Sequence, residues 1–238
     1  MATQTSRARP LAPSVPEEPS LPLYRLDAGR YNRMVEAGAL DGIDVELVDG
    51  LLVDKHHRGE DALHRLDVET FERMVATGEL EGERVELLEG LLIEVSPPSP
   101  EHSTPIVRLT RYLATARVWL HVQLPLATTR GSLPEPDLAL VEDEGLPSRH
   151  PRTALLAVEV SVTSHKKDRN TKAKLYAQAR VPTYWLVDVP GRVVEVRSDP
   201  GPGGYGRCEI YGIGAQVPSP TEGVPNLDVA SLFEGLGD

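Results

Sequence analysis

Hydrophobic and polar positions alternate along most of the chain in patterns that predict both helices and strands. Between residues 103 and 118, Ile106, Leu109 and Leu113 recur at helical spacing, which is typical of an amphipathic helix. Short apolar runs predict strands at about 120–128, 137–142, 155–162, 183–189, 193–198 and 205–211. A helix over 168–179 separates the third strand from the fourth, and this order is typical of a parallel crossover. We therefore expect a mixed α/β fold, with a central mixed sheet flanked by helices and a short closing helix at 224–236.

A repeat with an offset of 40 residues precedes this pattern. RLDAGRYNRMVEAGALDGIDVELVDGLLVD at 25–54 reappears as RLDVETFERMVATGELEGERVELLEGLLIE at 65–94. Each copy predicts a helix capped by Asp27 or Asp67, a glycine stop, and a hairpin with an Asp-Gly or Glu-Gly turn. Two copies are too few for a solenoid. We expect a duplicated helix-hairpin unit at the front of one domain, with the first copy packing against that domain or against a second chain.

The remainder of the front end is rich in proline. Residues 1–22 hold five prolines and almost no periodic apolar pattern, so we expect a disordered tail. The predicted organisation is a tail at 1–22, an extra repeat copy with its linker at 23–63, and the principal domain at 64–238.

Composition narrows the class of protein. Hydrophobic residues make up 40% and charged residues 26% of 238, as in ordinary globular proteins. One cysteine excludes an internal disulfide, and no apolar stretch has the length of a membrane span or secretory signal, so we expect a cytoplasmic protein without membrane contact. The net charge of −11 argues against tight non-specific adhesion to nucleic acid, although a locally basic cleft stays possible.

One acid interrupts a run that otherwise predicts a buried strand. Residues 154–162 read ALLAVEVSV, and alternation places Ala157, Glu159 and Ser161 on one face of the strand. A buried ionised carboxylate costs several kcal/mol unless it is paired or bound to a metal. The residues alone leave two interpretations of Glu159 open. It forms a salt bridge with the basic residues that follow, or it has a functional role.

A second acid and a lysine favour a functional role. Asp137 starts the preceding strand, and two carboxylates on neighbouring strands suit Mg²⁺, although Asp137 alone reads as a turn residue after Pro136. Lys172 shares a helical stripe with Leu175 and Tyr176, so its ammonium is expected to point inward and to meet an acid. An ammonium beside a metal-bound pair of carboxylates is able to orient a water or help to deprotonate it, and to offset negative charge on a scissile phosphate.

Three motifs in this order carry a family resemblance. PEPDLALV, AVEVSVTS and DRNTKAKLYAQARVPTYWLVD resemble the Uma-two family, whose members are described as putative restriction endonucleases of the PD-(D/E)XK nuclease superfamily. The resemblance runs from about His64 to Phe233 and implies a restriction endonuclease-like fold for 64–238. It also implies endonuclease activity that depends on Mg²⁺, with Mn²⁺ as a substitute.

The resemblance assigns roles to single residues. It makes Asp137 the acid of the PD motif and Glu159 the acid of the (D/E)XK motif, while Ser161 stands where the superfamily usually has its lysine. Lys172 matches the place from which this family supplies that lysine. Glu86 matches an early acid that binds metal or positions water, but it also reads as an exposed hairpin acid, as its repeat counterpart Glu46 does.

His102 closes the Pro-rich turn in the family pattern, and it also reads as a residue at the start of a helix. Seven basic residues are candidates for a phosphate-facing rim or for a solvated surface: Arg108, Arg111, His165, Lys166, Lys167, Arg169 and Lys174.

The sequence therefore predicts an endonuclease-like phosphodiester hydrolase with Asp137, Glu159 and Glu86 as metal ligands and Lys172 beside them. Its expected partners are nucleic acid, chiefly DNA, and a second copy of the chain in a homodimer. The alternatives are a catalytically silent dimeric binding or regulatory module, which the acidic charge favours, and a hydrolase of smaller phosphate esters.

Overall fold

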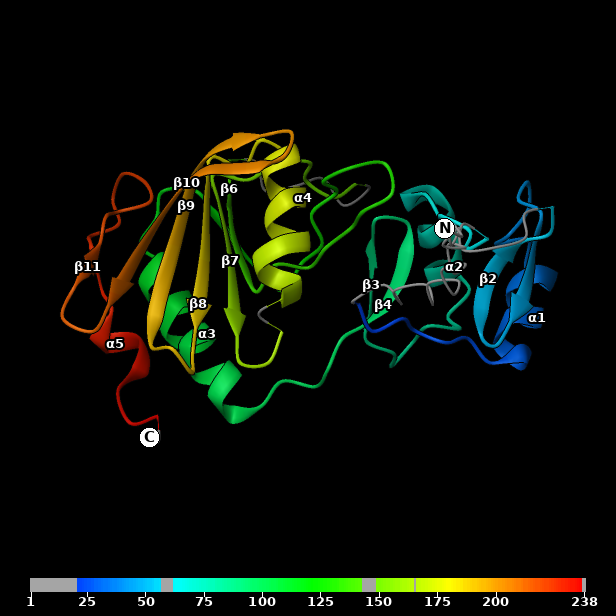
Figure 1. Ribbon diagram of the computed structural model, residues 1–238, viewed down its shortest axis with the longest axis horizontal. Helices are drawn as coiled ribbons and strands as arrows, with labels where there is room; N and C mark the ends of the chain where they lie inside the picture. Colours follow the sequence, from blue (N-terminus) through cyan, green and yellow to red (C-terminus); the bar gives the residue numbers. More distant parts are fainter. Residues whose placement is uncertain (1–20, 57–61, 143–148, 165, 237–238) are drawn as a thin grey trace, which may run out of the picture.

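The computed structural model describes residues 21–56, 62–142, 149–164 and 166–236, so nearly all of the predicted tail lies outside the described residues. In Figure 1 the molecule is elongated, with one large sheet at one end and the two repeat copies at the other. The helices are α1 (Ala28–Glu36), α2 (Val68–Ala76), α3 (Pro100–Leu113), the π-helix η1 (Lys167–Lys172), α4 (Ala173–Gln178) and α5 (Ala230–Phe233). The strands are β1 (Val45–Val48), β2 (Leu51–Asp54), β3 (Val85–Leu88), β4 (Leu91–Glu94), β5 (Trp119–Val122), β6 (Leu138–Val141), β7 (Leu156–Ser161), β8 (Thr183–Asp188), β9 (Val193–Gly201), β10 (Gly204–Gly212), β11 (Gln216–Val217) and β12 (Leu227–Asp228).

The large sheet has six strands in the order β10-β9-β8-β7-β6-β5. Only β7 and β8 are parallel, and η1 with α4 connects them, which confirms the predicted crossover. The other four pairings are antiparallel. The predicted mixed sheet flanked by helices is therefore present.

Three predicted boundaries were wrong. The helix expected at 103–118 is α3, which begins at Pro100 because Ser99 caps it by accepting a hydrogen bond from the amide of His102. The strand expected at 120–128 ends at Val122. The segment expected as one closing helix contains β12 before the short α5, because Leu227 pairs with Val217.

Both faces of β7 are covered, as the alternation predicted. Val158 and Val160 belong to an apolar core shared with α3 and α5, whereas Ala157 belongs to a second core on the α4 side, with Tyr176. Glu159 has the parity of Ala157 and is 4% exposed. The sequence therefore places a carboxylate under α4.

The two repeat copies have the predicted structure; we call residues 25–54 unit 1 and residues 65–94 unit 2. Asp27 caps α1 by accepting a hydrogen bond from the Arg30 amide at 3.0 Å, and Asp67 caps α2 in the same way. Asp49 and Gly50 have positive φ values of 48° and 79°, as a two-residue hairpin turn requires.

The units exchange short extended segments reciprocally. The residues before α1 pair with unit 2, since Leu23 forms an antiparallel bridge with Ile93. The residues before α2 pair with unit 1, since Leu63 forms the corresponding bridge with Val53. All four positions are related by the repeat offset, so the units are arranged as a pseudo-symmetric pair.

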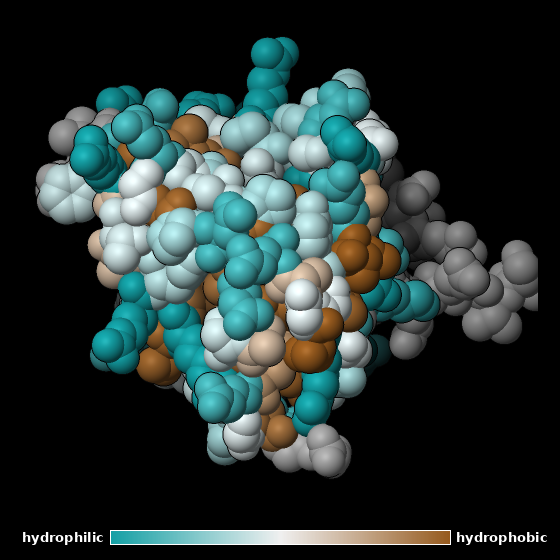
Figure 2. All heavy atoms as spheres, turned by 90° about the vertical axis from the view of Figure 1, so that its left-hand side faces the viewer, coloured by the Kyte–Doolittle hydropathy of each residue, from teal (hydrophilic) through white to brown (hydrophobic). Residues whose placement is uncertain are grey.

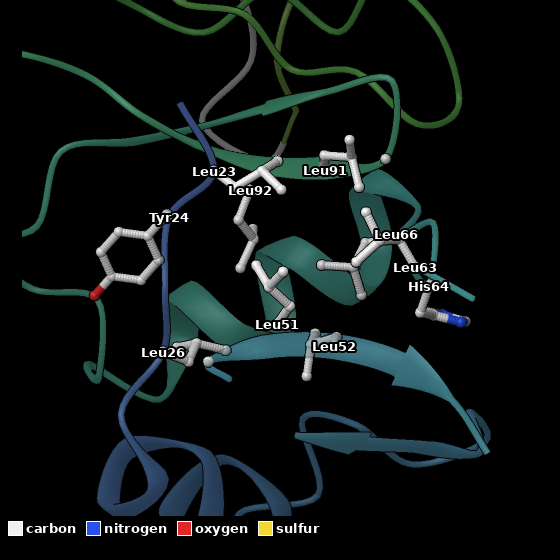
Figure 3. Close-up of a pocket in the computed structure, with 12 residues that line it drawn as sticks. Leu23, Tyr24, Leu26, Leu51, Leu52, Leu63, His64, Leu66, Leu91 and Leu92 are labelled. Carbon is white, nitrogen blue, oxygen red and sulfur yellow. The ribbon is translucent and has the colours of Figure 1, made fainter. Parts of the chain in front are cut away.

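Leucines fill the space between the units. Figure 3 shows leucines of both units around the space between them, with Leu51 of unit 1 pointing toward Leu92 of unit 2. The cavity left between them is only about 20 Å³, close to the size of one water. Because residues of both units belong to one apolar cluster, each unit covers the hydrophobic side of the other.

Deletion of residues 1–60 is expected to expose this side of unit 2. Leu66 and Leu92 are 3% and 8% exposed in the full chain, and without unit 1 they would contact water. We predict association or a lower unfolding temperature, measured by light scattering and thermal unfolding. Metal binding by the remainder is expected to persist; its loss would assign a site role to Glu46 or its neighbours. A stable monomer would contradict the predicted packing role.

The opposite end of the molecule has a mixed surface. Figure 2 shows hydrophilic side chains over most of this end, with apolar side chains between them. Ile210 and Ile213 are among the exposed apolar residues, at 66% and 57%. Within the described residues, the model has no helix that is both long and apolar enough to span a membrane.

Candidate active site

A cleft of about 810 Å³ lies where unit 2 meets the large sheet. Its lining includes residues of β3, the loop 95–99 and the start of α3, the residues just before β6, β7 with the loop that follows it, and η1. All five residues predicted for the site line it, namely Glu86, His102, Asp137, Glu159 and Lys172. The structure therefore brings the predicted residues together.

Asp137 and Glu159 lie opposite each other across two antiparallel strands. Leu138 pairs with Val158, and the same register continued by one residue sets Asp137 against Glu159. Directly opposite side chains in such a pair lie on one face, with Cβ atoms about 5 Å apart. Both carboxylates are buried, at 7% and 4% exposed.

Lys172 joins two of the acids. Its Nζ donates to Glu86 Oε1 and to Glu159 Oε1, each at 2.9 Å, and to the carbonyl oxygen of Glu135 at 3.3 Å. The second carboxylate oxygen of Glu86 is buried without a hydrogen-bond partner, and the nearest ion-pairing ammonium, that of Lys167, is 3.9 Å away. Glu86 thus keeps one unused oxygen at the cleft.

Asp168 and Lys172 both lie in the π-helix η1, four residues apart. Residues at this spacing share one side of a helix, and both side chains are 2% exposed. The inward stripe predicted for Lys172, Leu175 and Tyr176 is confirmed by their burial.

Burial and neighbouring charges determine the protonation of the central pair. Burial raises the pKa of Glu159 well above its usual value, and the nearby carboxylates of Asp137, Asp168 and Glu86 add to this against the opposing charge of Lys172. Burial alone would lower the pKa of Lys172, but the carboxylates of Glu159, Glu86 and Asp168 outweigh it and raise the pKa well above the ordinary range. Lys172 is therefore an ammonium at neutral pH.

Asp137 is held by groups on three elements. Its Oδ2 accepts a hydrogen bond from the amide of Val160 at 2.8 Å and lies 3.3 Å from His102 Nε2, and its Oδ1 lies 3.5 Å from Gln123 Nε2. Burial acts to raise the pKa of Asp137, but His102 and the Val160 amide outweigh it, so the pKa is lowered. The hydrogen bond to Asp137 raises the pKa of His102 against the effect of burial. His102 thus lies at a helix start and also contacts a site acid.

The pair of His102 and Asp137 is expected to stabilise the protein more at low pH. Because the folded pKa of His102 is raised, the stabilisation is complete below its unfolded pKa and is lost as pH rises through the folded pKa. His102→Gln should cost on the order of 1 kcal/mol near pH ~5.5 and less near pH ~8.5, as measured by denaturant unfolding. His150→Gln, at a more exposed pair with Glu72, serves as the control. An equal cost at both pH values would contradict the pairing.

Only part of the predicted basic rim faces the cleft. Lys166 and Lys167 line it, and Arg84 joins them from the start of β3. Arg108, Arg169 and Lys174 instead bond to groups away from the cleft. His165 lies outside the described residues.

The sequence did not single out two polar contacts to the acids. The hydroxyl of Tyr176 donates to Glu159 Oε1 at 2.6 Å, and burial raises the pKa of Tyr176 well above its usual value, so the proton stays on the phenol. Tyr176 was recognised only as part of an inward stripe. Gln123 follows β5 with no pattern in the sequence that links it to Asp137.

The donors at the cleft fit Mg²⁺ in their chemistry. Among the described residues, no three His, Cys, Asp or Glu side chains are grouped closely enough to hold an ion together. Mg²⁺ commonly takes only one or two carboxylates and keeps several waters, and Asp137 and Glu159 supply that number. The oxygen of Glu86 that has no hydrogen-bond partner lies at the same cleft. Four buried acids, Glu86, Asp137, Glu159 and Asp168, surround a single buried ammonium, so the cleft has an excess of negative charge that a cation would neutralise.

Comparison with known proteins is consistent with this arrangement. A family model described as "Uma2: Putative restriction endonuclease" matches residues 68–231, a range that includes most of unit 2 but not unit 1. A solved structure described as a putative nuclease belonging to DUF820, from Anabaena variabilis, is 17% identical; the alignment covers 63% of this chain and 89% of that one, with a TM-score of 0.49. No curated protein matches the chain. Because the family model matches well over half of the sequence and contains all five cleft residues, the chain belongs to the Uma2 family of restriction endonuclease-like proteins.

Proposed function

We propose that this chain is a metal-dependent endonuclease that hydrolyses phosphodiester bonds of DNA. The observation that supports the proposal most strongly is the convergence of Asp137, Glu159, Glu86 and Lys172 on one cleft. These residues come from four separate elements, and the family description names a nuclease.

Asp137 and Glu159, with Glu86 beside them, would hold the Mg²⁺, which when bound supplies an acidified water and offsets charge on the scissile phosphate. The protein must first release Glu159 from its proton and from Lys172. Burial favours the protonated form of Glu159, so binding of Mg²⁺ is coupled to release of this proton. The affinity for Mg²⁺ should therefore rise with pH.

Lys172 would act as a fixed positive charge and hydrogen-bond donor. Its raised pKa keeps the ammonium protonated at neutral pH, so it is unsuited to remove a proton from water. It is suited to orient a water and to stabilise negative charge that develops on the phosphate oxygens. Tyr176 would keep Glu159 oriented through the hydroxyl bond.

A nucleic-acid substrate is consistent with the local charge at the mouth of the cleft. Lys166 and Lys167 line the cleft with Arg84, although the whole chain carries −11. Local cations of this kind bind phosphates and give a salt-dependent affinity. The volume of the cleft, about 810 Å³, lies within the range of ligand-binding sites.

Incubation with supercoiled plasmid tests the proposal. We expect nicking with Mg²⁺ or Mn²⁺, and none when a chelator is present. Glu86→Gln is expected to reduce nicking, whereas Glu46→Gln, its exposed counterpart in unit 1, should not. No nicking of DNA under any metal condition, or equal effects of the two substitutions, would contradict the proposal.

A catalytically silent binding module is the second candidate. The specific observation in its favour is that Lys172 already pairs with both Glu86 and Glu159. Calorimetry with Mn²⁺ distinguishes the two candidates, since an active site should bind the ion and lose it on Asp137→Ala. A silent module would bind no ion in either form.

A further inference from the structure

Unit 2 has an extended segment of the same chain along its β3 edge. Leu133 forms an antiparallel bridge with Leu87, and its amide donates to the carbonyl oxygen of Leu87 at 2.8 Å. The carbonyl oxygens of Arg130 and Gly131 accept hydrogen bonds from the amides of Val68 and Gly90, at 2.8 and 2.6 Å. The segment 129–133 therefore lies as a short extra strand across the hairpin turn and the start of α2.

Side chains also hold the segment 129–133 on unit 2. The hydroxyl of Ser132 accepts a hydrogen bond from the amide of Glu89 at 2.8 Å, and Leu133, 4% exposed, joins the apolar cluster of the two units. A Cβ atom at Gly131 would lie 3.3 Å from the carbonyl oxygen of Leu66, so glycine permits the close approach. The edge of unit 2 therefore favours a glycine at position 131, a small polar residue at position 132 and an apolar residue at position 133.

Unit 1 repeats the same backbone groups without an occupant. The counterparts are the amides of Ala28, Asp49 and Gly50 and the carbonyl of Leu47, which we call the unit 1 edge. Among the described residues, these four groups have no partner corresponding to the segment 129–133. Leu47 and Leu52 lie opposite each other in the hairpin, and the carbonyl oxygen of Leu52 accepts a hydrogen bond from the amide of His64 on one side of it. The carbonyl oxygen of Leu47 points to the other side of the hairpin.

The side chains at the unit 1 edge are more exposed than their counterparts in unit 2. Leu87 and Leu88 are fully buried, whereas Leu47 is half-buried and Val48 is 44% exposed. Unit 1 lies at the end of the molecule away from the large sheet, so its outer side is free of the rest of the described chain (Figure 1). An edge with unpaired backbone groups is a ready site for strand addition.

We propose that the unit 1 edge binds an extended segment of a partner protein with the chemistry of Arg-Gly-Ser-Leu. The occupant of unit 2 provides the template for each position. Arg130 lies 3.4 Å from Asp67, and the corresponding acid of unit 1, Asp27, is 63% exposed. Asp27 already lies 3.4 Å from Arg30 Nε but is exposed enough to be reached by a second cation, so a basic residue before the glycine would share its negative charge.

A second copy of this chain fits the edge less well. Its own segment 129–133 is already seated on its unit 2. Pairing of two β1 strands across the edge would bring their acids together, since Asp44, Glu46 and Asp49 are all exposed in and around this strand. Like charges placed opposite each other in a strand pair are destabilising.

A peptide that copies residues 126–135, LATTRGSLPE with blocked ends, tests the proposal with the full-length protein. We expect saturable binding of one peptide per chain by calorimetry, and slower hydrogen exchange at residues 47–50. A peptide with valine at the glycine should bind about tenfold more weakly or not at all, because its Cβ would already lie as close as 3.3 Å to backbone and the two further methyl groups need more room.

Ala28→Pro locates the binding in unit 1. Proline is tolerated at the first position of a helix, and Asp27 is already extended, so α1 should remain while the amide donor is lost. Binding is expected to fall about tenfold with an unchanged unfolding temperature. As a control, Val35→Ser removes an apolar side chain of α1 that is 46% exposed, and it should leave binding unchanged.

Three results would overturn the proposal. They are the absence of saturable peptide binding, equal binding of the glycine and valine peptides, and binding that Ala28→Pro leaves intact. Dimerisation of the free protein that Ala28→Pro abolishes would instead identify a second copy of the chain as the occupant.

Discussion

Glu159→Gln is expected to lower plasmid nicking by about 10³-fold, the equivalent of several kcal/mol of lost transition-state stabilisation. Glutamine keeps the size of the side chain and an oxygen that accepts from Tyr176, but it removes the charge that would hold an ion. Burial already favours the uncharged form of this carboxyl, so folding should be almost unaffected. Initial nicking rates at saturating Mg²⁺, with circular dichroism to confirm the fold, measure this effect.

Glu195→Gln is the matched control. Glu195 is also buried, at 5% exposed, and is also ion-paired, with Arg169 and Arg197, but it lies on β9 outside the cleft. We expect it to lower stability at least as much as Glu159→Gln and to leave the nicking rate within about threefold. Similar losses of activity in both variants would show that stability, and not ion binding, accounts for the effect of Glu159.

Lys172→Met is expected to cost about 3–5 kcal/mol of unfolding free energy and to abolish nicking. The substitution leaves Glu86 and Glu159 buried without the ammonium that both contact at 2.9 Å. Denaturant unfolding measures the cost. In the double variant with Glu159→Gln, part of the stability should return, because one of the two uncompensated carboxylates is gone.

The cost of Lys172→Met should grow as pH rises. Burial raises the pKa of Glu159, so below its unfolded pKa this carboxyl is protonated in both states and needs no partner. As pH rises from the unfolded towards the folded pKa, keeping it buried without Lys172 costs progressively more. We expect a clearly larger cost near pH ~8 than near pH ~5. Lys174→Met, at an ammonium that is 46% exposed, should change stability by less than about 0.5 kcal/mol at either pH. A cost that does not depend on pH would contradict the coupling between Lys172 and Glu159.

The residues of the cleft were predictable to different degrees. Glu159 and Lys172 stand out because each breaks an apolar pattern, and burial turns such a break into a need for a partner. Glu86 gave no such signal, since Glu46 lies in the same Val-Glu-Leu context and is exposed. Only the docking of unit 2 on the large sheet buries Glu86 beside Lys172.

Local geometry was the least predictable part of the site. Helical periodicity predicted one helix at 168–179, but its first turn is the π-helix η1. The contact between Gln123 and Asp137 joins residues from the end of β5 and the start of β6, and no spacing in the sequence indicates it. Trp119 is 50% exposed, although large aromatic side chains usually pack in the core, because β5 is the edge strand of the sheet.

The sequence by itself determined the repeated units, the mixed sheet and the acids and lysine of the cleft, because caps, turn residues and hydrophobic periodicity are local properties of the chain. Tertiary structure alone decided that unit 1 covers unit 2, that Glu86 differs from Glu46, and that the unit 2 edge is filled by residues 129–133 whereas no described segment fills the unit 1 edge. The physical reason is that two nearly identical segments have the same local preferences but different neighbours. Burial, charge pairing and backbone partners depend on those neighbours, which come from distant parts of the chain.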